Sequence, residues 1–160
     1  MTISKNNFRE ALRHWASGVT VVTTKDRAGC LHGITVSAFS SVSLHPPLIL
    51  ICIEKGAGSH HAFIENDLFI INILSDKQEH VSRRFASHSR DKFVGIETAE
   101  GSNGIPRISG ALANLECRRM LSYEGGDHTI FVGEIENSII HPGKPLLYFN
   151  GHYGKIEKHL

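Results

Sequence analysis

The sequence predicts a mainly β fold with short helices, arranged as an antiparallel barrel with Greek-key connections. Segments typical of strands outnumber those typical of helices, and the turns between them lie close together. No Gly-x-Gly-x-x-Gly motif joins a strand to a helix, which argues against a doubly wound, dinucleotide-binding sheet. With 160 residues and 41% hydrophobic content, we expect one domain, residues 1–160, with a substantial core.

Composition narrows the class of protein. A formal net charge of +1 gives no extended basic surface for nucleic acid. No segment reaches the roughly 20 apolar residues of a membrane span, and the polar start does not resemble a signal peptide. Three cysteines without a Cys-x-x-Cys pair favour a cytoplasmic protein without disulfides. The eleven histidines are scattered, so no metal site is expected.

The first expected elements are a helix and a hairpin. Asn7 followed by Glu10 resembles a helix N-cap with its reciprocal partner, and the apolar residues from 8 to 15 share one helical stripe. Residues 19–24 are all β-branched and predict a strand, which a polar turn connects to a return strand at 31–35.

The next two strands lie on either side of a pair of prolines. Strands are expected at residues 40–44 and 48–53, because Pro46 and Pro47 cannot donate to a ladder and belong at an edge or a connection. The apolar run at 48–53 is expected to be buried on both faces.

A central strand and two short helices follow. Ser59 is placed to cap a helix at 60–65, and a second helix is expected at 77–86. Between them, residues 68–74 are apolar enough to form another central strand.

The remainder is expected to be a loop followed by strands. Residues 87–109 lose periodicity and collect glycines, which predicts a long surface loop of the kind that usually has a function. Two long strands at 111–123 and 129–140 are joined by a glycine-rich turn, and short strands at 146–149 and 153–156 close the fold.

The most informative stretch runs from Gly33 to Cys52. Small hydroxylated residues precede the two prolines, and an apolar strand follows them. Hydroxyls and accessible backbone N–H groups suit a flat, phosphorylated ligand, which we interpret as a flavin. The alternative is a bend whose hydroxyls only satisfy local backbone groups.

Several motifs resemble one family in their order and spacing. They are Phe8–Leu12 with Gly18–Thr23, Gly33–Leu44 with Pro46-Pro47-Leu48, Gly126–Thr129, and Pro145–Phe149 with Gly151 and Tyr153. Over nearly its whole length the chain resembles the short-chain flavin reductases of two-component monooxygenase systems, in the FMN-binding split-barrel superfamily. The resemblance implies a split barrel and a homodimer that uses NADH or NADPH to reduce FMN or FAD. It also implies a partner monooxygenase that receives the reduced flavin.

The candidate cofactor-binding residues come from the hydroxylated bend, the strand after the prolines, the expected loop and the C-terminus. They are Thr35, Val36, Ser37, Ala38, Ser40, Ser41, Cys52, Ile53, Lys55, Ser59, His60, Arg84, Phe85, Lys92, Phe93, Gly151, His152 and Tyr153. Lys55 and Ser59 are expected on the phosphate side, where a helix start favours anions. Cys52 is expected to pack beside the ring without reacting. Phe85 is equally suited to a helix core.

His128 is the candidate catalytic residue, on the nicotinamide side. It follows a glycine turn and so lies at the barrel rim. An imidazole there can donate to the nicotinamide or hold negative charge near the flavin. The alternative is a histidine paired with Asp127 or Glu124. Many relatives carry an arginine within residues 150–152, and its absence here favours NADH over NADPH.

Two other functions remain open at this point. The chain could be a non-catalytic FMN-binding split barrel that stores or senses flavin. It could also pass electrons through reduced flavin to a cobalamin or ferric substrate. A barrel of this size with an apolar rim is better sealed by a second copy, which independently favours a homodimer.

Overall fold

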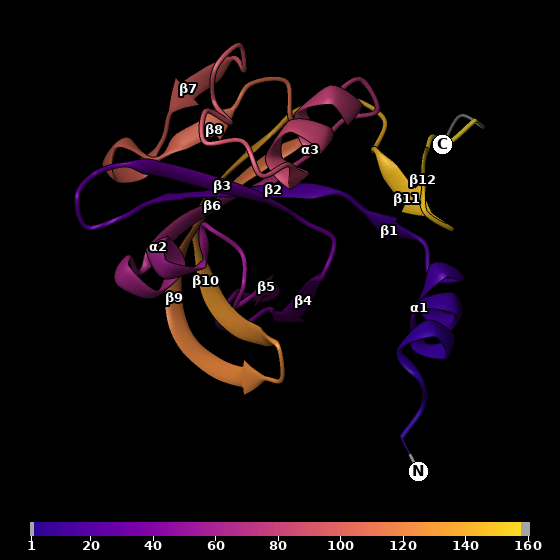
Figure 1. Ribbon diagram of the computed structural model, residues 1–160. Coiled ribbons are helices and arrows are strands. Elements are labelled where there is room, and N and C mark those ends of the chain that lie inside the picture. The colour runs from indigo at the N-terminus through magenta and orange to yellow at the C-terminus, as the bar shows by residue number, and fades with distance from the viewer. Residues whose placement is uncertain (1, 158–160) are drawn as a thin grey trace.

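The computed structural model describes residues 2–157 and places a curved seven-stranded antiparallel sheet at the centre of the molecule (Figure 1). The strand order is β3-β2-β6-β9-β10-β5-β4. These strands are β2 (Thr20–Lys25), β3 (Leu31–Val36), β4 (Phe39–Ser43), β5 (Leu48–Glu54), β6 (Leu68–Ile73), β9 (Ala113–Gly125) and β10 (His128–Ile140). Each lies within two residues of its expected range, so the antiparallel β prediction is confirmed.

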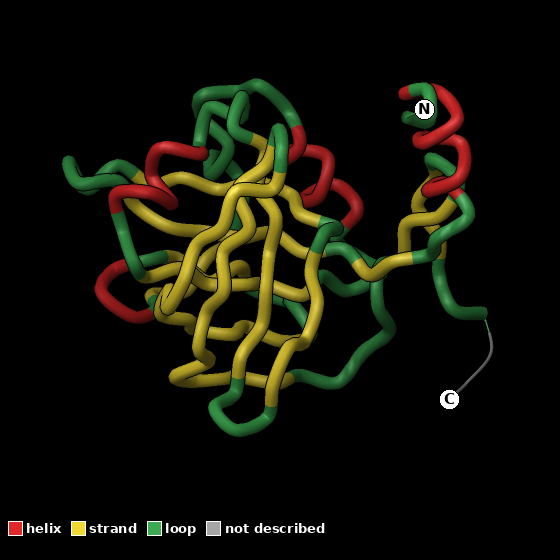
Figure 2. Tube along the Cα trace, turned by 90° about the horizontal axis from the view of Figure 1, so that it is seen from below, coloured by secondary structure: helices red, strands yellow, loops and turns green. Residues whose placement is uncertain are grey.

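Figure 2 shows the curvature of the main sheet. The sheet encloses one apolar cluster and carries a second on its other side. Ile51, Ile71 and Phe131 are fully buried in the first cluster. The second packs α3 (Glu79–Ala86) against β2 through Phe85. Because strand side chains alternate, β2 serves both clusters and is buried on both faces.

Strand β5 does not follow its prediction. Its side chains alternate, with Ile49, Ile51 and Ile53 buried while Leu50 and Cys52 are half-buried. The expectation that both faces are buried is therefore wrong. The outer face of β5 lines a cleft instead, through Leu50 and Cys52.

The N-terminal helix and a small sheet form an arm beside the main sheet. Helix α1 (Lys5–Arg13) has no buried residue. The small sheet contains β1 (Ser17–Gly18), β11 (Leu147–Phe149) and β12 (His152–Gly154). Figures 1 and 2 both show the arm at one side of the barrel.

The start of α1 differs from the sequence expectation. The cap is Ser4, whose hydroxyl accepts the backbone N–H of Asn7 at 3.2 Å. Asn7 therefore lies inside the helix, because a serine three residues earlier already satisfies its N–H. Among residues 2–157, no helix is long and apolar enough to cross a membrane.

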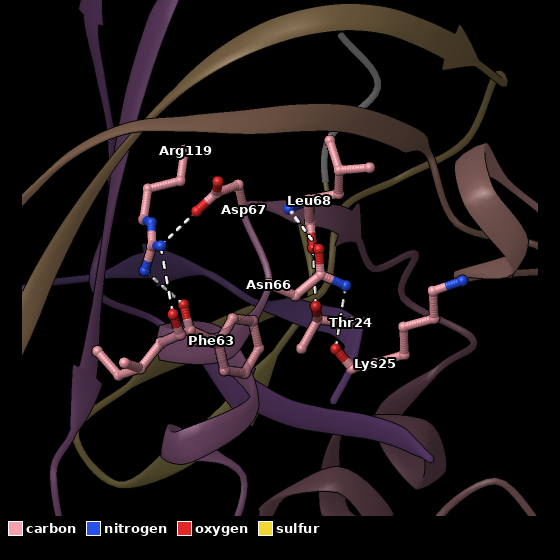
Figure 3. A network of polar contacts seen from close by, with 8 residues as sticks. Thr24, Lys25, Phe63, Asn66, Asp67, Leu68 and Arg119 are labelled. Atoms are coloured by element: carbon pink, nitrogen blue, oxygen red, sulfur yellow. Dashed lines mark hydrogen bonds and ion pairs between the residues drawn. The ribbon is translucent and has the colours of Figure 1, made fainter. Parts of the chain in front are cut away.

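A polar network fixes α2 (His60–Glu65) to the sheet (Figure 3). Arg119 of β9 donates to the carbonyl of Phe63 at 2.8 Å and forms an ion pair with Asp67. Asn66 donates to the carbonyl of Lys25 at 3.0 Å. These bonds satisfy carbonyls at the end of α2 and hold that end against the β2–β3 hairpin. At its start, Ser59 makes no capping bond, contrary to expectation.

The expected long loop is partly structured. Within residues 87–109 the chain forms β7 (Thr98–Glu100), a 3-10 turn η1 (Ser102–Gly104) and β8 (Pro106–Ile108). The loop prediction is wrong for this part, where Ile108 is buried. Strands of only three residues, with glycines between them, give little periodic signal, which explains the error.

Asn72 is the main polar group inside the fold. It is fully buried, and its side-chain amide donates to the carbonyl of Val21 at 2.8 Å. Its oxygen accepts the backbone N–H of Ile108 at 2.9 Å and the side-chain amide of Asn114 at 2.8 Å. One residue thus satisfies polar groups of β2, β8 and β9.

We expect Asn72→Ala to lower the free energy of unfolding by about 3 kcal/mol or more, because it leaves several buried polar groups without partners. Urea denaturation measures the change. The exposed Asn6→Ala is the control and should stay within about 0.5 kcal/mol of the parent. Equal, small effects of the two substitutions would contradict this role for Asn72.

Candidate functional site

The two edges of the main sheet meet at Ser37 and Ala38. These residues, which we call the closure turn, connect β3 at one edge directly to β4 at the other. So short a connection brings the two edges within about 10 Å of each other. The backbone N–H of Cys52 donates to the carbonyl of Ala38 at 3.0 Å and ties the turn to β5.

A cleft of about 710 Å³ opens beside the closure turn, and we call it the rim cleft. It lies between the closure turn, the outer face of β5 and the arm. Its apolar lining includes Leu12, Trp15, Ala38, Phe39, Leu50 and Cys52. The burial of Cys52 raises the pKa of its thiol, which keeps the group protonated at neutral pH.

Only part of the hydroxylated bend reaches the rim cleft. Ser37 and Ser40 line it. Thr35 lies on the other side of the bend and donates its hydroxyl to the carbonyl of Ser82 at 2.7 Å. Val36 is buried in the core. Strand alternation turns Val36 to the core, and β3 ends there, so Ser37 follows the turn into the cleft. The unbroken hydroxylated pattern concealed this division.

A second cavity, of about 490 Å³, lies beside the β2–β3 hairpin, and we call it the hairpin cavity. Its lining includes Cys30, His32, Ser59, Arg90, Lys92 and Phe93. The hydroxyl of Ser59 is buried and has no hydrogen-bond partner among the described residues. An unpaired buried hydroxyl facing a cavity has free capacity to bind a ligand.

Basic side chains give the hairpin cavity its polar character. Lys92 donates to the carbonyls of Gly33 at 3.2 Å and Phe85 at 2.9 Å, and burial lowers its pKa. Arg90 is exposed and brings a guanidinium group to the cavity. Phe93 lies edge-on to Phe85 at 5.0 Å between ring centres.

Several candidate residues lie outside both cavities. Phe85 is fully buried in the core, as the helix interpretation allowed. Arg84 donates to the carbonyl of Val94 at 3.2 Å. Ile53 faces the core, and Ser41 is exposed on β4.

The turn between β9 and β10 gathers a separate polar cluster. Lys55 forms an ion pair with Glu124 and donates to the carbonyl of Gly126 at 2.7 Å. His60 and Thr129 are hydrogen-bonded at 2.9 Å. Burial, and then the charge of Lys55, lowers the pKa of His60, which favours its neutral form. Neither Lys55 nor His60 lines a cavity.

His128 does not line the rim cleft, but it lies on the same face of the sheet as Cys52, which does. In the pairing of β10 with β5, His128 lies opposite Glu54 and Ile130 lies opposite Cys52. Diagonal neighbours of this kind are roughly 7–8 Å apart. Its Nδ1 is 2.7 Å from an oxygen of Asp127, and this hydrogen bond lowers the pKa of the Asp127 carboxyl.

The C-terminal candidates divide between the cleft and the arm. Gly151 lines the rim cleft with a φ of +80°, a conformation that favours glycine. His152 is exposed. The hydroxyl of Tyr153 is 2.8 Å from that of Ser82, and the Arg83 guanidinium lies 4.8 Å from its ring centre.

Sequence reasoning missed two sets of lining residues. The first is Leu12 on α1 with Trp15 just beyond its end, which line the rim cleft and belong to neither core cluster. The second is the hairpin and loop around His32 and Arg90. The expectation of a functional loop at 87–109 was the one signal that indicated Arg90.

Comparison with known proteins gives consistent results. The chain is 39% identical over 155 residues to FMN reductase (NADH) SmoA of Agrobacterium fabrum, covering 97% of this chain and 88% of that protein. It is 38% identical over 152 residues, 95% of this chain and 81% of the other, to the reductase component of 4-nitrophenol 4-monooxygenase/4-nitrocatechol 2-monooxygenase of Rhodococcus opacus.

Solved structures agree with these relatives. NADH:FAD oxidoreductase SgcE6 of Streptomyces globisporus, in complex with NAD and FAD fragments, superposes with a TM-score of 0.90 at 36% identity. The match covers 98% of this chain and 96% of that one. The model of the flavin reductase like domain matches residues 12–157. The chain therefore belongs to the family of flavin reductase like domains.

Proposed function

We propose that this chain is an NADH-dependent flavin reductase, which reduces FMN or FAD and supplies the reduced flavin to a partner monooxygenase. The observation that carries the proposal is the shared lining of the two cavities. The same two stretches of chain line both: residues 30–33 and 58–59 line the hairpin cavity, and residues 37–40, 50 and 52 line the rim cleft. Similar proteins named as NADH-dependent FMN or FAD reductases support the choice of cofactors.

The spacing of the cavities suits a flavin nucleotide. Gly33 lines the hairpin cavity and Ser37 lines the rim cleft. Ser37 lies four positions after Gly33, which along a strand is about 13 Å. A flavin nucleotide is elongated, with a flat apolar ring at one end and a phosphate at the other. At that spacing, the apolar rim cleft matches the ring and the polar hairpin cavity matches the phosphate.

The rim cleft fits the flat end of the flavin. Phe39 and Leu50 provide apolar walls, and the closure turn provides small residues that let a ring approach the backbone. The protonated thiol of Cys52 acts as a small apolar group at this surface. These groups bind and orient an isoalloxazine ring without reacting with it.

The hairpin cavity fits the phosphorylated end. The unpaired hydroxyl of Ser59 supplies a donor, and Arg90 supplies a positive charge. Lys92 is already bonded to two carbonyls, so it shapes the cavity wall between Gly33 and Phe85. Phosphate recognition in this proposal therefore depends on Ser59 and Arg90 and does not require Lys55.

When bound, NADH supplies a hydride that the flavin accepts. The protein's part is to hold the two rings in contact and to exclude water. We place the nicotinamide on the His128 side of the rim cleft. The hydrogen bond from Nδ1 to Asp127 orients the imidazole and leaves Nε2, the acceptor nitrogen of the neutral ring, free to bond the ligand.

We further propose that the chain acts as a homodimer formed through the arm. Exposed apolar side chains gather on α1, just beyond its end and on β11, and these are Phe8, Leu12, Trp15, Tyr148 and Phe149. A patch of this kind marks an interaction site, and a second copy seated on it would close the open side of the rim cleft. The reductase components among the relatives support a monooxygenase as the acceptor of reduced flavin.

The reductase proposal is tested by steady-state assays that cross NADH and NADPH with FMN, FAD and riboflavin. We expect NADH oxidation that depends on added flavin, with NADPH a poorer donor. The loss of NADH absorbance measures the rate. No turnover above the enzyme-free rate would contradict the proposal. Flavin retained through dialysis but not reduced by NADH would indicate a binding protein instead.

Filling the rim cleft tests where the flat end of the flavin binds. Ala38→Phe adds a ring at the closure turn and should raise the flavin dissociation constant about 10- to 100-fold, the effect of an overpacking cost of about 1–3 kcal/mol. Fluorescence titration measures it. Ala28→Phe, in the exposed β2–β3 turn, is the control. Unchanged affinity in the Ala38 variant would place the ring elsewhere.

A charge in the arm patch tests the dimer. Phe149→Glu should yield a monomer in analytical ultracentrifugation, with weaker flavin binding because the rim cleft stays open. Phe149 is 48% exposed and does not line the cleft itself. Ile64→Glu, at a similarly exposed site on α2, should leave the sedimentation coefficient unchanged. A parent protein that sediments as a monomer would contradict the proposal directly.

A further inference from the structure

Three side chains that the reductase proposal does not use converge beside the β2–β3 hairpin. They are Asp26 at the end of β2, His32 on β3 and His61 on α2, and their ligating atoms all lie within 4.8 Å of one another. The Asp26 carboxylate is 2.9 Å from Nε2 of His32 and 4.0 Å from Nε2 of His61. The residues lie 6 and 29 positions apart in the sequence, which is why no spacing motif reveals them.

The backbone holds these three residues in place. On one side of Asp26, the carbonyl of Lys25 accepts a hydrogen bond from Asn66 at 3.0 Å. On the other side, the N–H of Arg27 donates to the Glu65 carboxylate at 2.9 Å. Both partners lie at the end of α2, so the hairpin cannot move away from His61 without losing both bonds. Figure 3 shows the Asn66 bond within the network that fixes α2.

The carboxylate at the centre of the cluster is also held in position. The backbone N–H of Cys30 donates to its other oxygen at 2.8 Å. The hydrogen bond with His32 is the largest influence that lowers the pKa of Asp26, so the carboxylate is anionic at neutral pH. Supporting bonds of this type orient metal ligands in proteins and raise their affinity.

We propose that Asp26, His32 and His61 form a binding site for one divalent transition-metal ion of the Zn²⁺ class. Two imidazole nitrogens and one carboxylate oxygen are ligands that such ions prefer. In a tetrahedral site with metal–ligand distances of about 2.0–2.1 Å, ligand atoms are roughly 3.3 Å apart. The Asp26–His32 distance already suits this geometry. The side chain of His61, 52% exposed, moves inward by about 1 Å to complete the set.

A purely structural role explains only part of the cluster. The Asp26–His32 hydrogen bond alone would brace the hairpin. It does not require His61, whose ring lies edge-on to that of His32 with centres 4.8 Å apart. Three protein ligands leave coordination positions for solvent or a further ligand. Because His32 also lines the hairpin cavity, the bound ion lies at the edge of that cavity.

The proposal is tested by calorimetric titration of the full chain, freed of metal with EDTA, with ZnCl₂. We expect one Zn²⁺ per chain. His61→Gln should weaken binding by more than the roughly 10- to 100-fold that loss of an outer-shell partner costs. Added Zn²⁺ should raise the melting temperature of the parent but not that of His61→Gln. Asp26→Asn should also bind weakly, but it can disturb the hairpin, so His61→Gln decides.

The matched control is His141→Gln, which removes an exposed histidine far from the cluster in sequence. It should bind Zn²⁺ as the parent does. Absence of saturable binding in the parent would overturn the proposal, as would equal Zn²⁺ affinity of His61→Gln and the parent. The test needs neither flavin nor NADH, so its failure is independent of the reductase proposal.

Discussion

Closure of the sheet at Ser37 and Ala38 is the constraint on which the remaining architecture depends. Two residues connect opposite edges of a seven-stranded sheet, and the Ala38–Cys52 hydrogen bond holds the connection against β5. A longer connection would let the edges separate, and the rim cleft would lose its wall. The small side chains at this point leave the rim cleft open beside the connection.

Strand β5 shows how one element serves the core and the site together. Ile51 faces the interior and Cys52 faces the rim cleft, so adjacent residues have different tasks. The period of two in a strand makes this division unavoidable. A one-residue shift in register would place isoleucines in the cleft and the cysteine in the core, so core packing also fixes the register of the site.

The sequence predicted the strands better than the site. Long β-branched and alternating runs, such as residues 19–24, specify strands locally, and local pattern is enough to find them. The cavities depend on which side of a bend each residue faces, which explains why Ser37 reaches the cleft and Thr35 does not. The convergence of His61 with Asp26 depends on the placement of α2, which tertiary bonds set and no local pattern encodes.

The position of α1 has a consequence for how such proteins diversify. This helix supplies Leu12 to the rim cleft, with Trp15 just beyond its end, yet buries none of its residues in the barrel. Recognition and folding are thus encoded in physically separate parts of the chain. Mutations on α1 can therefore change which ring the cleft accepts without lowering the stability of the barrel. Selectivity can then change during evolution without passing through variants that fail to fold.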